Sequence, residues 1–259
     1  MPIERLDLEN SEESDILVSE HRLRYKFISE FLTSEKVLDI ACGSGYGSYY
    51  LSLNNDLQVT GVDLSSDSIS KAKENYQEAN LKFQVANALS LPFEDNSFDI
   101  VVSLETIEHF NVSDQRLYLA ELKRVLTPVG KLWLSTPNAK ASKHKNPWHL
   151  KELDLDELQD MLMKNFCYYN ILKQGTALAT IISSDRINTH DAIVDLSTQL
   201  YPKYFLAVAS DDYIADISNV AVSLNAKAFI RLDNHPLKRI SDAIYHPLSK
   251  MIKRMKEGN

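Results

Sequence analysis

The chain has 259 residues, of which 44% are hydrophobic and 25% are charged, and this composition is typical of a soluble globular protein with one large domain, with or without an appendage. Its formal net charge of −8 opposes nonspecific binding to a phosphate backbone and argues against general nucleic-acid binding. The acidic N-terminal sequence and the lack of an apolar run of about 18 residues predict a cytoplasmic protein.

Short apolar runs alternate with segments of helical composition along most of the chain. In chain order the pattern predicts strands at 36–41, 58–63, 81–86, 98–104 and 130–135, with helices that begin near 46, 65 and 113. A helix near 155–164 and strands near 166–172 and 202–210 follow. Such alternation implies a mostly parallel sheet covered on both faces. We therefore predict a Rossmann-like, doubly wound α/β fold of seven strands whose last strand is antiparallel.

The chain is predicted to hold one main domain over residues 1–212, with an insertion at about 175–201, and a helical extension over 213–259. The last 25 residues carry six basic and two acidic side chains, a local charge of 6 − 2 = +4. This basic, amphipathic tail is predicted to be either a solvated helix or a contact for anionic lipid headgroups, a lipid-linked or nucleotide diphosphate, or a partner enzyme.

Three of the seven glycines, Gly43, Gly45 and Gly47, fall within five residues between a predicted strand and a predicted helix. In this geometry backbone amides face a ligand, and glycine permits its close approach. A dinucleotide fingerprint would need a glycine where Ser48 stands, and no lysine follows the glycines as a phosphate-binding P-loop requires. The turn is therefore predicted to bind a nucleotide-like ligand of another kind.

Asp39 on the first strand, the sequence ACGSGYG after it, and Asp63 at the end of the second strand resemble the class I S-adenosylmethionine-dependent methyltransferases over residues 15–210. The resemblance implies that VLDIACGSG contacts the methionine part of the cofactor and that Asp63 accepts the two ribose hydroxyls. It places Asn87 against the adenine amino group, where the family usually has an acid. The implied cofactor contacts are Arg24, Tyr25, Asp39, Ala41, Gly43, Gly45, Asp63, Leu64, Asn87, Ala88, Leu104 and Glu105.

Other readings of these residues stay open at this point. Asp63 could cap the next helix, and Asn87 could hold a turn. Ala41 stands where the family often has a glycine. Arg24 and Tyr25 could cover the edge of the pocket, or contact the methionine carboxylate or the acceptor.

Candidate acceptor residues follow the fourth strand in the sequence SLETIEH, residues 103–109. If this turn is helical, Glu105, Glu108 and His109 share one face, and His149 could reach the same end of the sheet. The set looks like the metal site of small-RNA 3′-terminal 2′-O-methyltransferases, and its first part is similar to ubiquinone-pathway O-methyltransferases. It would suit a divalent metal such as Mg or Mn. Without a metal, His109 is the candidate base, with Glu108 and His149 beside it, and a purely structural role is the third reading.

Two further segments, EHRLRY at 20–25 and NPWHLKEL at 146–153, resemble methyltransferases associated with bacterial surface polysaccharides. The resemblance implies an S-adenosylmethionine-dependent O-methyltransferase that acts on a sugar hydroxyl of a cell-surface glycan or its precursor. The basic tail would then contact a glycosyltransferase or the inner membrane surface. The alternatives are methylation of a small phenolic or quinone metabolite, methylation of an RNA 3′ end, and a non-catalytic scaffold that binds the cofactor and positions a glycosyltransferase.

Overall fold

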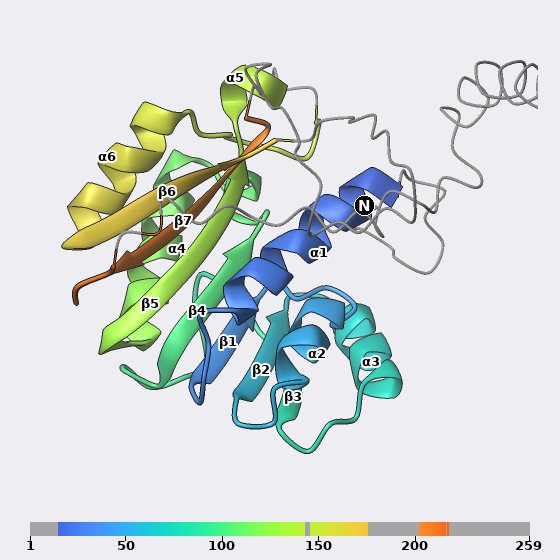
Figure 1. The fold of residues 1–259 in the computed structure, drawn as a ribbon. Helices are drawn as coiled ribbons and strands as arrows, with labels where there is room; N and C mark the ends of the chain where they lie inside the picture. The colour runs from blue at the N-terminus through green and yellow to red at the C-terminus, as the bar shows by residue number, and fades with distance from the viewer. Residues whose placement is uncertain (1–14, 143–145, 176–201, 216, 218–259) are drawn as a thin grey trace, which may run out of the picture.

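A computed structural model describes residues 15–142, 146–175, 202–215 and 217 of the chain. One twisted sheet runs through the described part, with helices packed on both of its faces (Figure 1). Its strands are β1 (Lys36–Ile40), β2 (Gln58–Asp63), β3 (Leu81–Val85), β4 (Phe98–Leu104), β5 (Leu126–Pro137), β6 (Tyr168–Gln174) and β7 (Tyr204–Ser210). The helices are α1 (Asp15–Ser29), α2 (Tyr46–Ser52), α3 (Ser66–Asn75), α4 (Val112–Val125), α5 (Ala139–Ser142) and α6 (Leu155–Asn165), with a 3₁₀ turn η1 (Ile107–His109).

The strand order is β3-β2-β1-β4-β5-β7-β6. Strands β1 to β5 pair in parallel, and β7 pairs antiparallel with both β5 and β6. The predicted fold class is therefore confirmed. The order turns back between β1 and β4, and ligands of doubly wound sheets bind at the carboxyl ends of the strands at this point. The glycine turn after β1 and the turn η1 after β4 follow neighbouring strand ends there, because β1 and β4 are paired, with Ile40 opposite Ser103.

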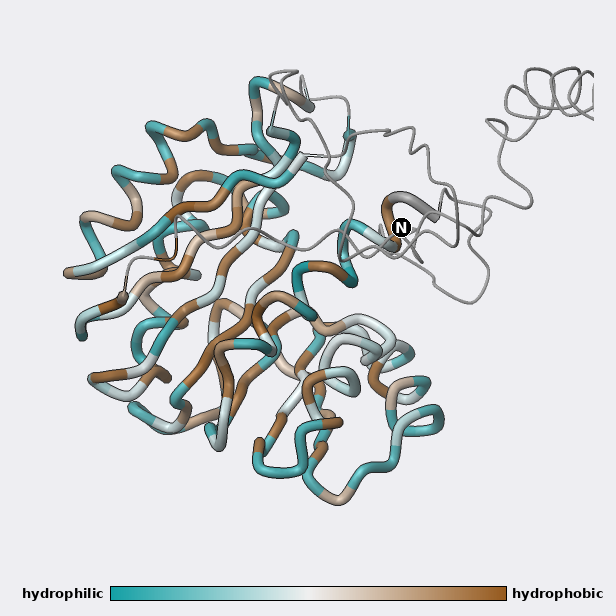
Figure 2. The backbone as a smooth tube through the Cα atoms, viewed as in Figure 1, coloured by the Kyte–Doolittle hydropathy of each residue, from teal (hydrophilic) through white to brown (hydrophobic). Residues whose placement is uncertain are grey.

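Two apolar cores, one on each face, hold the helices to the sheet. On one face α1, α2 and α3 contribute Ile28, Leu51 and Ile69, and on the other α4 and α6 contribute Leu119, Leu122, Leu158 and Leu162. The apolar residues follow the strands through the middle of the molecule (Figure 2). A parallel sheet covered on both sides needs nearly continuous apolar strands, as in FDIVVSL of β4. The buried acid of β1, Asp39, departs from this pattern and belongs to the site.

Short polar side chains set the starts of three helices. Ser65 caps α3 by accepting from the Ser68 amide, and Asn111 caps α4 by accepting from the Asp114 amide. Asp154 opens α6 in a reciprocal capping box with Glu157. These starts lie within two residues of the predicted ones. Strand β5 is longer than predicted, since it also includes the residues on both sides of 130–135.

Parts of the predicted domain organisation lie outside the described residues. The predicted insertion falls there except for its first residue, and so do the predicted helical form of the C-terminal extension and its basic tail. Among the residues that the structure describes, no helix combines the length and the apolar character that a bilayer span needs.

Arg124 on α4 holds the connection between β3 and β4 in place. Its guanidinium donates to the carbonyl oxygens of Leu91 and Phe93 and to the carboxylates of Asp95 and Glu121, at 2.7 to 3.2 Å. Charge-assisted hydrogen bonds contribute more than neutral ones. We expect Arg124→Ala to lower the free energy of unfolding by about 1–3 kcal/mol, measured by urea denaturation.

Arg124→Lys is the matched control, because it keeps the charge and loses the planar set of donors. We expect an intermediate loss for this variant. A stability of Arg124→Ala equal to that of the wild type would contradict the role assigned to the guanidinium.

Candidate active site

The glycine turn is built from left-handed backbone at alternate positions. Ala41, Gly43 and Gly45 have φ values of 56°, 56° and 88°. A Cβ on Gly45 would lie 2.7 Å from both the Phe83 ring and the Ala72 methyl group. A Cβ on Gly43 would meet nothing within 4 Å. Gly45 is therefore required by packing inside the protein, whereas the space beside Gly43 holds no atom of the described residues.

Gly47, the third glycine, is required by helix packing. A Cβ there would lie 2.0 Å from the ring of Tyr25 on α1. The close packing of α1 against α2 therefore explains Gly47. The sequence analysis had instead grouped this glycine with those that permit close approach of a ligand.

Asp63 ties the end of β2 to the glycine turn. Its Oδ2 accepts from the Gly43 amide at 3.0 Å, and its Oδ1 accepts from the Ser65 amide at 2.8 Å. The cap of α3 is Ser65, so the alternative that Asp63 caps this helix is wrong. A carboxylate has about four lone-pair positions, so half-buried Asp63 keeps acceptor capacity for ribose hydroxyls. The side chain of Leu64, next in the chain, is 70% exposed.

Asp39 lies fully inside the protein beneath the glycine turn. Its carboxyl oxygens accept from the Tyr25 hydroxyl at 3.0 and 3.2 Å and from the Ser48 hydroxyl at 2.6 Å. Burial raises the pKa of Asp39 to about 7, against the opposing effect of the hydrogen bonds from Ser48 and Tyr25. Asp39 thus connects β1 by hydrogen bonds to Tyr25 on α1 and to Ser48 on α2, the helix that follows the glycine turn.

The raised pKa of Asp39 predicts a pH-dependent stability. Because the folded pKa exceeds the unfolded value near 3.9, folding takes up a proton between about pH 4 and pH 7, and stability falls as the pH rises through this window. We expect Asp39→Asn to flatten the fall, measured by urea denaturation at pH 4.5, 6 and 7.5. Tyr25→Phe removes a donor that favours the carboxylate, so the fall should extend to higher pH. Equal profiles for both variants and the wild type would contradict this assignment.

The residues predicted to surround adenine lie on the connection after β3. The Asn87 side-chain oxygen accepts from the Leu89 amide at 2.9 Å, so Asn87 holds a turn. Its amide oxygen keeps a second lone pair for a ligand. Ala88 is half-buried, and Leu104 at the end of β4 is 5% exposed. Contact of these residues with adenine stays a prediction.

The expectation that Glu105 shares a helical face with Glu108 and His109 is wrong. Glu105 has a φ of 52° and precedes the 3₁₀ turn, so the i, i+3, i+4 geometry of an α-helix does not form. Its Oε1 accepts from the Ser135 hydroxyl at 2.7 Å and lies 3.8 Å from the Arg24 guanidinium. Glu105 is therefore directed to β5 and α1.

Arg24 on α1 places a buried positive charge beside Glu105. Its side chain is 3% exposed, and its Nε has no hydrogen-bond partner among the described residues. The guanidinium donates to the Gln174 side chain at 2.8 Å and lies 4.6 Å from the centre of the Tyr204 ring. Gln174 and Tyr204 were missed by the sequence reasoning, since they follow in the chain about 150 and 180 residues later and match no local motif.

A cluster of Glu108, His109 and His149 lies after β4. One carboxylate oxygen and one nitrogen of each imidazole lie within 4.8 Å of one another. Glu108 is fully buried: its Oε2 accepts from the Thr136 hydroxyl at 3.2 Å, and its Oε1 has no hydrogen-bond partner in the described part of the chain. Burial and then the charge of Glu105 raise the pKa of Glu108 well above its usual value. The structure thus brings together three of the four residues proposed as metal ligands.

The segment that carries His149 wraps around η1. The amides of Leu150 and Lys151 donate to the Glu108 carbonyl at 2.9 and 3.1 Å. The His109 Nδ1 donates to the Trp148 carbonyl at 3.2 Å, because a carbonyl oxygen only accepts. This hydrogen bond leaves Nε2 of His109 as the nitrogen that can accept a proton.

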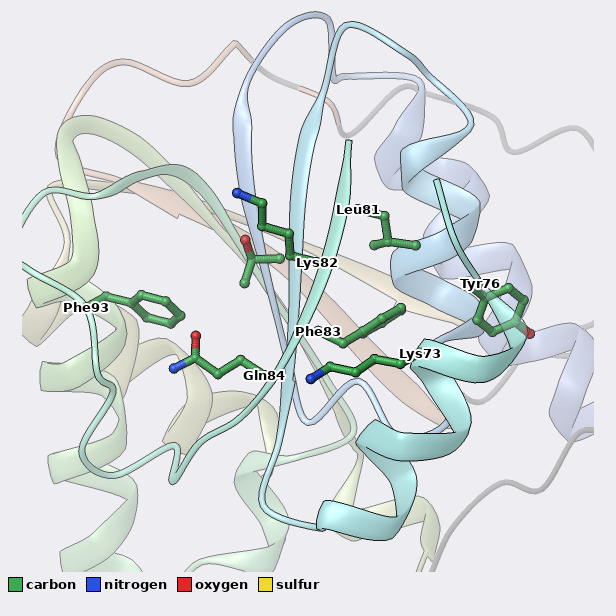
Figure 3. Close-up of a pocket in the computed structure, with 8 residues that line it drawn as sticks. Lys73, Tyr76, Leu81, Lys82, Phe83, Gln84 and Phe93 are labelled. Atoms are coloured by element: carbon green, nitrogen blue, oxygen red, sulfur yellow. The ribbon is translucent and has the colours of Figure 1, made fainter. Parts of the chain in front are cut away.

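A separate hollow lies away from this chemistry, at the free edge of β3. It has a volume of about 570 Å³, and its lining includes Lys82 and Gln84 on one side of the strand and Leu81 and Phe83 on the other (Figure 3). The titratable groups discussed above are not part of its lining. We therefore place the site at the carboxyl ends of β1 and β4.

The parallel sheet, the left-handed turn after β1 and the acid that ends β2 are arranged as the resemblance to class I S-adenosylmethionine-dependent methyltransferases implies. Residues 38–134 match the family model described as a methyltransferase domain. The expected resemblance to S-adenosylmethionine-dependent methyltransferases is therefore confirmed.

Similar proteins agree with this class. A Mycobacterium tuberculosis protein named as a probable S-adenosylmethionine-dependent methyltransferase is 32% identical over 148 residues, which cover 55% of this chain and 52% of that protein. An O-methyltransferase of Aspergillus nomiae is 35% identical over 128 residues, 46% of this chain and 55% of its own length. The chain thus spans about half the length of these curated relatives. The crystal structure of an S-adenosylmethionine-dependent methyltransferase from Archaeoglobus fulgidus superposes with a TM-score of 0.56 at 21% identity, over 76% of this chain and 94% of that one, and shares the fold.

Proposed function

We propose that the protein transfers a methyl group from S-adenosylmethionine to a hydroxyl group. The observation that carries this proposal is the meeting of two sets of residues at one edge of the sheet. The open turn at Gly43 and the carboxylate of Asp63 fit a nucleoside with an amino-acid tail, and His109 with Glu108 lies after the neighbouring strand. Methyl transfer needs this adjacency, since much of its catalysis is alignment.

The cofactor would lie across the carboxyl ends of β1 and β2. Asp63 would accept the ribose hydroxyls, and Leu64, Asn87 and Ala88 would surround the adenine. Arg24, with its buried and incompletely bonded guanidinium, would receive the methionine carboxylate. Ala41, Gly45 and Tyr25 would shape the turn, as Asp39 does from beneath, while Leu104 and Glu105 would border the sulfonium end.

His109 is proposed as the general base. An alcohol is hardly ionised near neutral pH, so its proton must leave as its oxygen attacks the methyl carbon and the carbon–sulfur bond breaks. His109 would take this proton on Nε2, since its Nδ1 donates to the Trp148 carbonyl. The positive charge of the sulfonium thus ends on the imidazolium, which then releases the proton to solvent.

A divalent metal is a second proposed mode of activating the hydroxyl. The donor set of Glu108, His109 and His149 fits a cation chemically, because one carboxylate oxygen and one nitrogen of each imidazole lie within 4.8 Å of one another, and Glu108 is buried. A bound ion would lower the pKa of the acceptor hydroxyl. Calorimetry with Mn²⁺ and Mg²⁺ tests this mode, with Glu108→Gln as the variant. Full turnover after chelation, together with an absence of heat on metal addition, would contradict the metal mode. General-base catalysis by His109 would then be the remaining mode of activation.

A sugar hydroxyl of a surface polysaccharide or its precursor is our proposed acceptor. Its support is the similarity of segments 20–25 and 146–153 to polysaccharide-associated methyltransferases, together with Trp148, an aromatic residue that is 38% exposed and whose backbone carbonyl accepts from His109. The relatives named above do not specify a glycan. A phenolic or quinone metabolite would use the same aromatic face, and an RNA 3′ end the same base.

Two measurements test the proposed activity. Calorimetry should detect binding of S-adenosylmethionine and S-adenosylhomocysteine, and transfer of a labelled methyl group should occur to a methyl glycoside in preference to catechol or a short RNA. Transfer to catechol or RNA instead would replace the proposed acceptor. Cofactor binding without turnover on any of them would favour the scaffold, and absent binding would contradict the proposal as a whole.

The C-terminal tail is proposed to bring the protein to an anionic membrane surface or to a glycosyltransferase. The support is its local charge of +4, counted from six basic and two acidic residues. Sedimentation with vesicles rich in phosphatidylglycerol should show weak, salt-sensitive binding. No binding at low ionic strength would contradict the membrane contact.

A further inference from the structure

Gln174 ends β6 and connects this strand to α1. Its side-chain oxygen accepts from Nη1 of Arg24 at 2.8 Å, and its Nε2 donates to the Glu20 carbonyl at 2.9 Å. The guanidinium only donates and the carbonyl only accepts, so one orientation of the amide satisfies both partners. Glu20 and Arg24 lie one turn apart on α1. A single amide therefore links the guanidinium to the backbone of the helix that carries it.

The backbone around Gln174 is held by β7 and by the end of β5. Gln174 pairs with Tyr204 across β6 and β7, and the Lys203 amide donates to the Gln174 carbonyl at 2.9 Å. Asn138, which follows β5, donates from its backbone amide to the Lys203 carbonyl and from its side chain to the Pro202 carbonyl, both at 2.8 Å. A side chain on a strand that is bonded in this way keeps a defined position.

The guanidinium of Arg24 is enclosed, but its charge is only partly compensated. Its side chain is 3% exposed, and it lies over the Tyr204 ring at 4.6 Å from the ring centre. The Glu105 carboxylate is 3.8 Å from Nη2, which is longer than a hydrogen bond, and Nε has no hydrogen-bond partner among the described residues. Because a buried charge is costly unless hydrogen bonds and an opposite charge compensate it, a further anion is favoured beside Arg24.

We propose that Gln174 is a positioning residue, which holds the Arg24 guanidinium where it receives the carboxylate of the methionine part of the cofactor. This inference rests on the proposed function, which assigns that carboxylate to Arg24. A neutral amide suits the task, because it orients the guanidinium without neutralising it. A carboxylate at position 174 would instead form an ion pair with Arg24 and weaken its attraction for an anionic ligand.

Two ligands separate the carboxylate from the rest of the cofactor: S-adenosylhomocysteine and its decarboxylated form, S-adenosyl-3-thiopropylamine, which keeps the nucleoside and the amine. Calorimetry with the whole chain gives their Kd values, and we expect the wild type to prefer S-adenosylhomocysteine. Gln174→Met should lower this affinity about five- to tenfold, the effect of one hydrogen bond to a charged group, and leave the decarboxylated ligand unchanged. Gln174→Glu should lower it further and bind the decarboxylated ligand at least as tightly, because an added carboxylate repels an anion and attracts a cation.

Two further variants distinguish positioning from a general loosening of α1. Arg24→Met should remove the preference for the carboxylate, and Gln174→Met added to it should change the preference no further, because both substitutions break the same contact. Lys203→Met is the matched control: it breaks another contact of β7 with α1, between Nζ of Lys203 and the Glu20 carboxylate at 3.0 Å. We expect this control to keep the wild-type ratio of the two Kd values.

An unchanged ratio in the Gln174 variants would overturn the proposal, and so would an equal loss of affinity for both ligands or a change of the same size in Lys203→Met. If Gln174→Met does not fold, Gln174→Glu, which keeps an acceptor for Arg24, decides the question. Absent binding of S-adenosylhomocysteine by the wild type would contradict the proposed function. A preference for the carboxylate that Arg24→Met removes and both Gln174 variants keep would overturn the role of Gln174 alone.

Discussion

His109→Ala should lower kcat for methyl transfer by about 10²- to 10⁴-fold, the range typical for loss of a general base. The affinity for S-adenosylhomocysteine should not change, because the imidazole bonds to the Trp148 carbonyl and to no part of the glycine turn in the described structure. Calorimetry and single-turnover methyl transfer separate the two effects. Added imidazole should restore part of the activity if the lost group is a proton acceptor.

Val112→Ala is the control for this variant, since Val112 opens α4 three residues later and is 51% exposed. We expect its kcat to match the wild type. If His109→Ala kept full turnover with the true acceptor, neither a base nor a metal ligand at this position would remain tenable.

Gly45→Ala should destabilise the fold by about 2–5 kcal/mol. The left-handed backbone at this position costs a side chain about 1–2 kcal/mol, and the contacts of its Cβ with Ala72 and Phe83 at 2.7 Å add the cost of overpacking, about 1–3 kcal/mol. Urea denaturation measures the loss. Binding of S-adenosylhomocysteine should also weaken, because the turn must move to admit the methyl group.

Gly43→Ala separates packing from binding in the same turn. Its φ of 56° is also left-handed, but its Cβ would meet nothing within 4 Å. We expect a loss of stability of about 1–2 kcal/mol, from the backbone alone, together with a loss of cofactor affinity larger than this instability explains. Equal stability losses in the two variants would contradict the assignment of Gly45 to packing, and unchanged affinity in Gly43→Ala would place the ligand elsewhere.

The course of the chain could be predicted from local patterns. Short apolar runs rich in β-branched residues, such as FDIVVSL, favour buried strands. Helices begin after Ser65, Asn111 and Asp154 because the side chains of these caps satisfy free amide groups. The glycine cluster marked the turn correctly. Its individual glycines were not distinguished, because their different neighbours, Phe83 and Tyr25, come from β3 and α1.

The sequence predicted which residues follow β4 as candidate acceptor residues, but it did not predict the directions of their side chains. Spacing placed Glu105 with Glu108 and His109, on the assumption of an α-helix after β4. The left-handed backbone at Glu105 is incompatible with an α-helix at this position. The Glu105 carboxylate instead accepts a hydrogen bond from Ser135 on the adjacent strand. Glu108 was visible in the sequence, yet its full burial was not, since the sequence does not show which carboxyl groups lose contact with water.

The sequence by itself determined the order of strands and helices along the chain and the position of the glycine turn, because these depend on periodicity and on contacts between near neighbours. The tertiary structure alone decided which groups meet: Arg24 with Gln174, 150 residues away, and His149 with the cluster at η1. Burial also raises the pKa of Asp39 to about 7. Desolvation and long-range pairing depend on the packed arrangement of all elements, and no local pattern of residues encodes them.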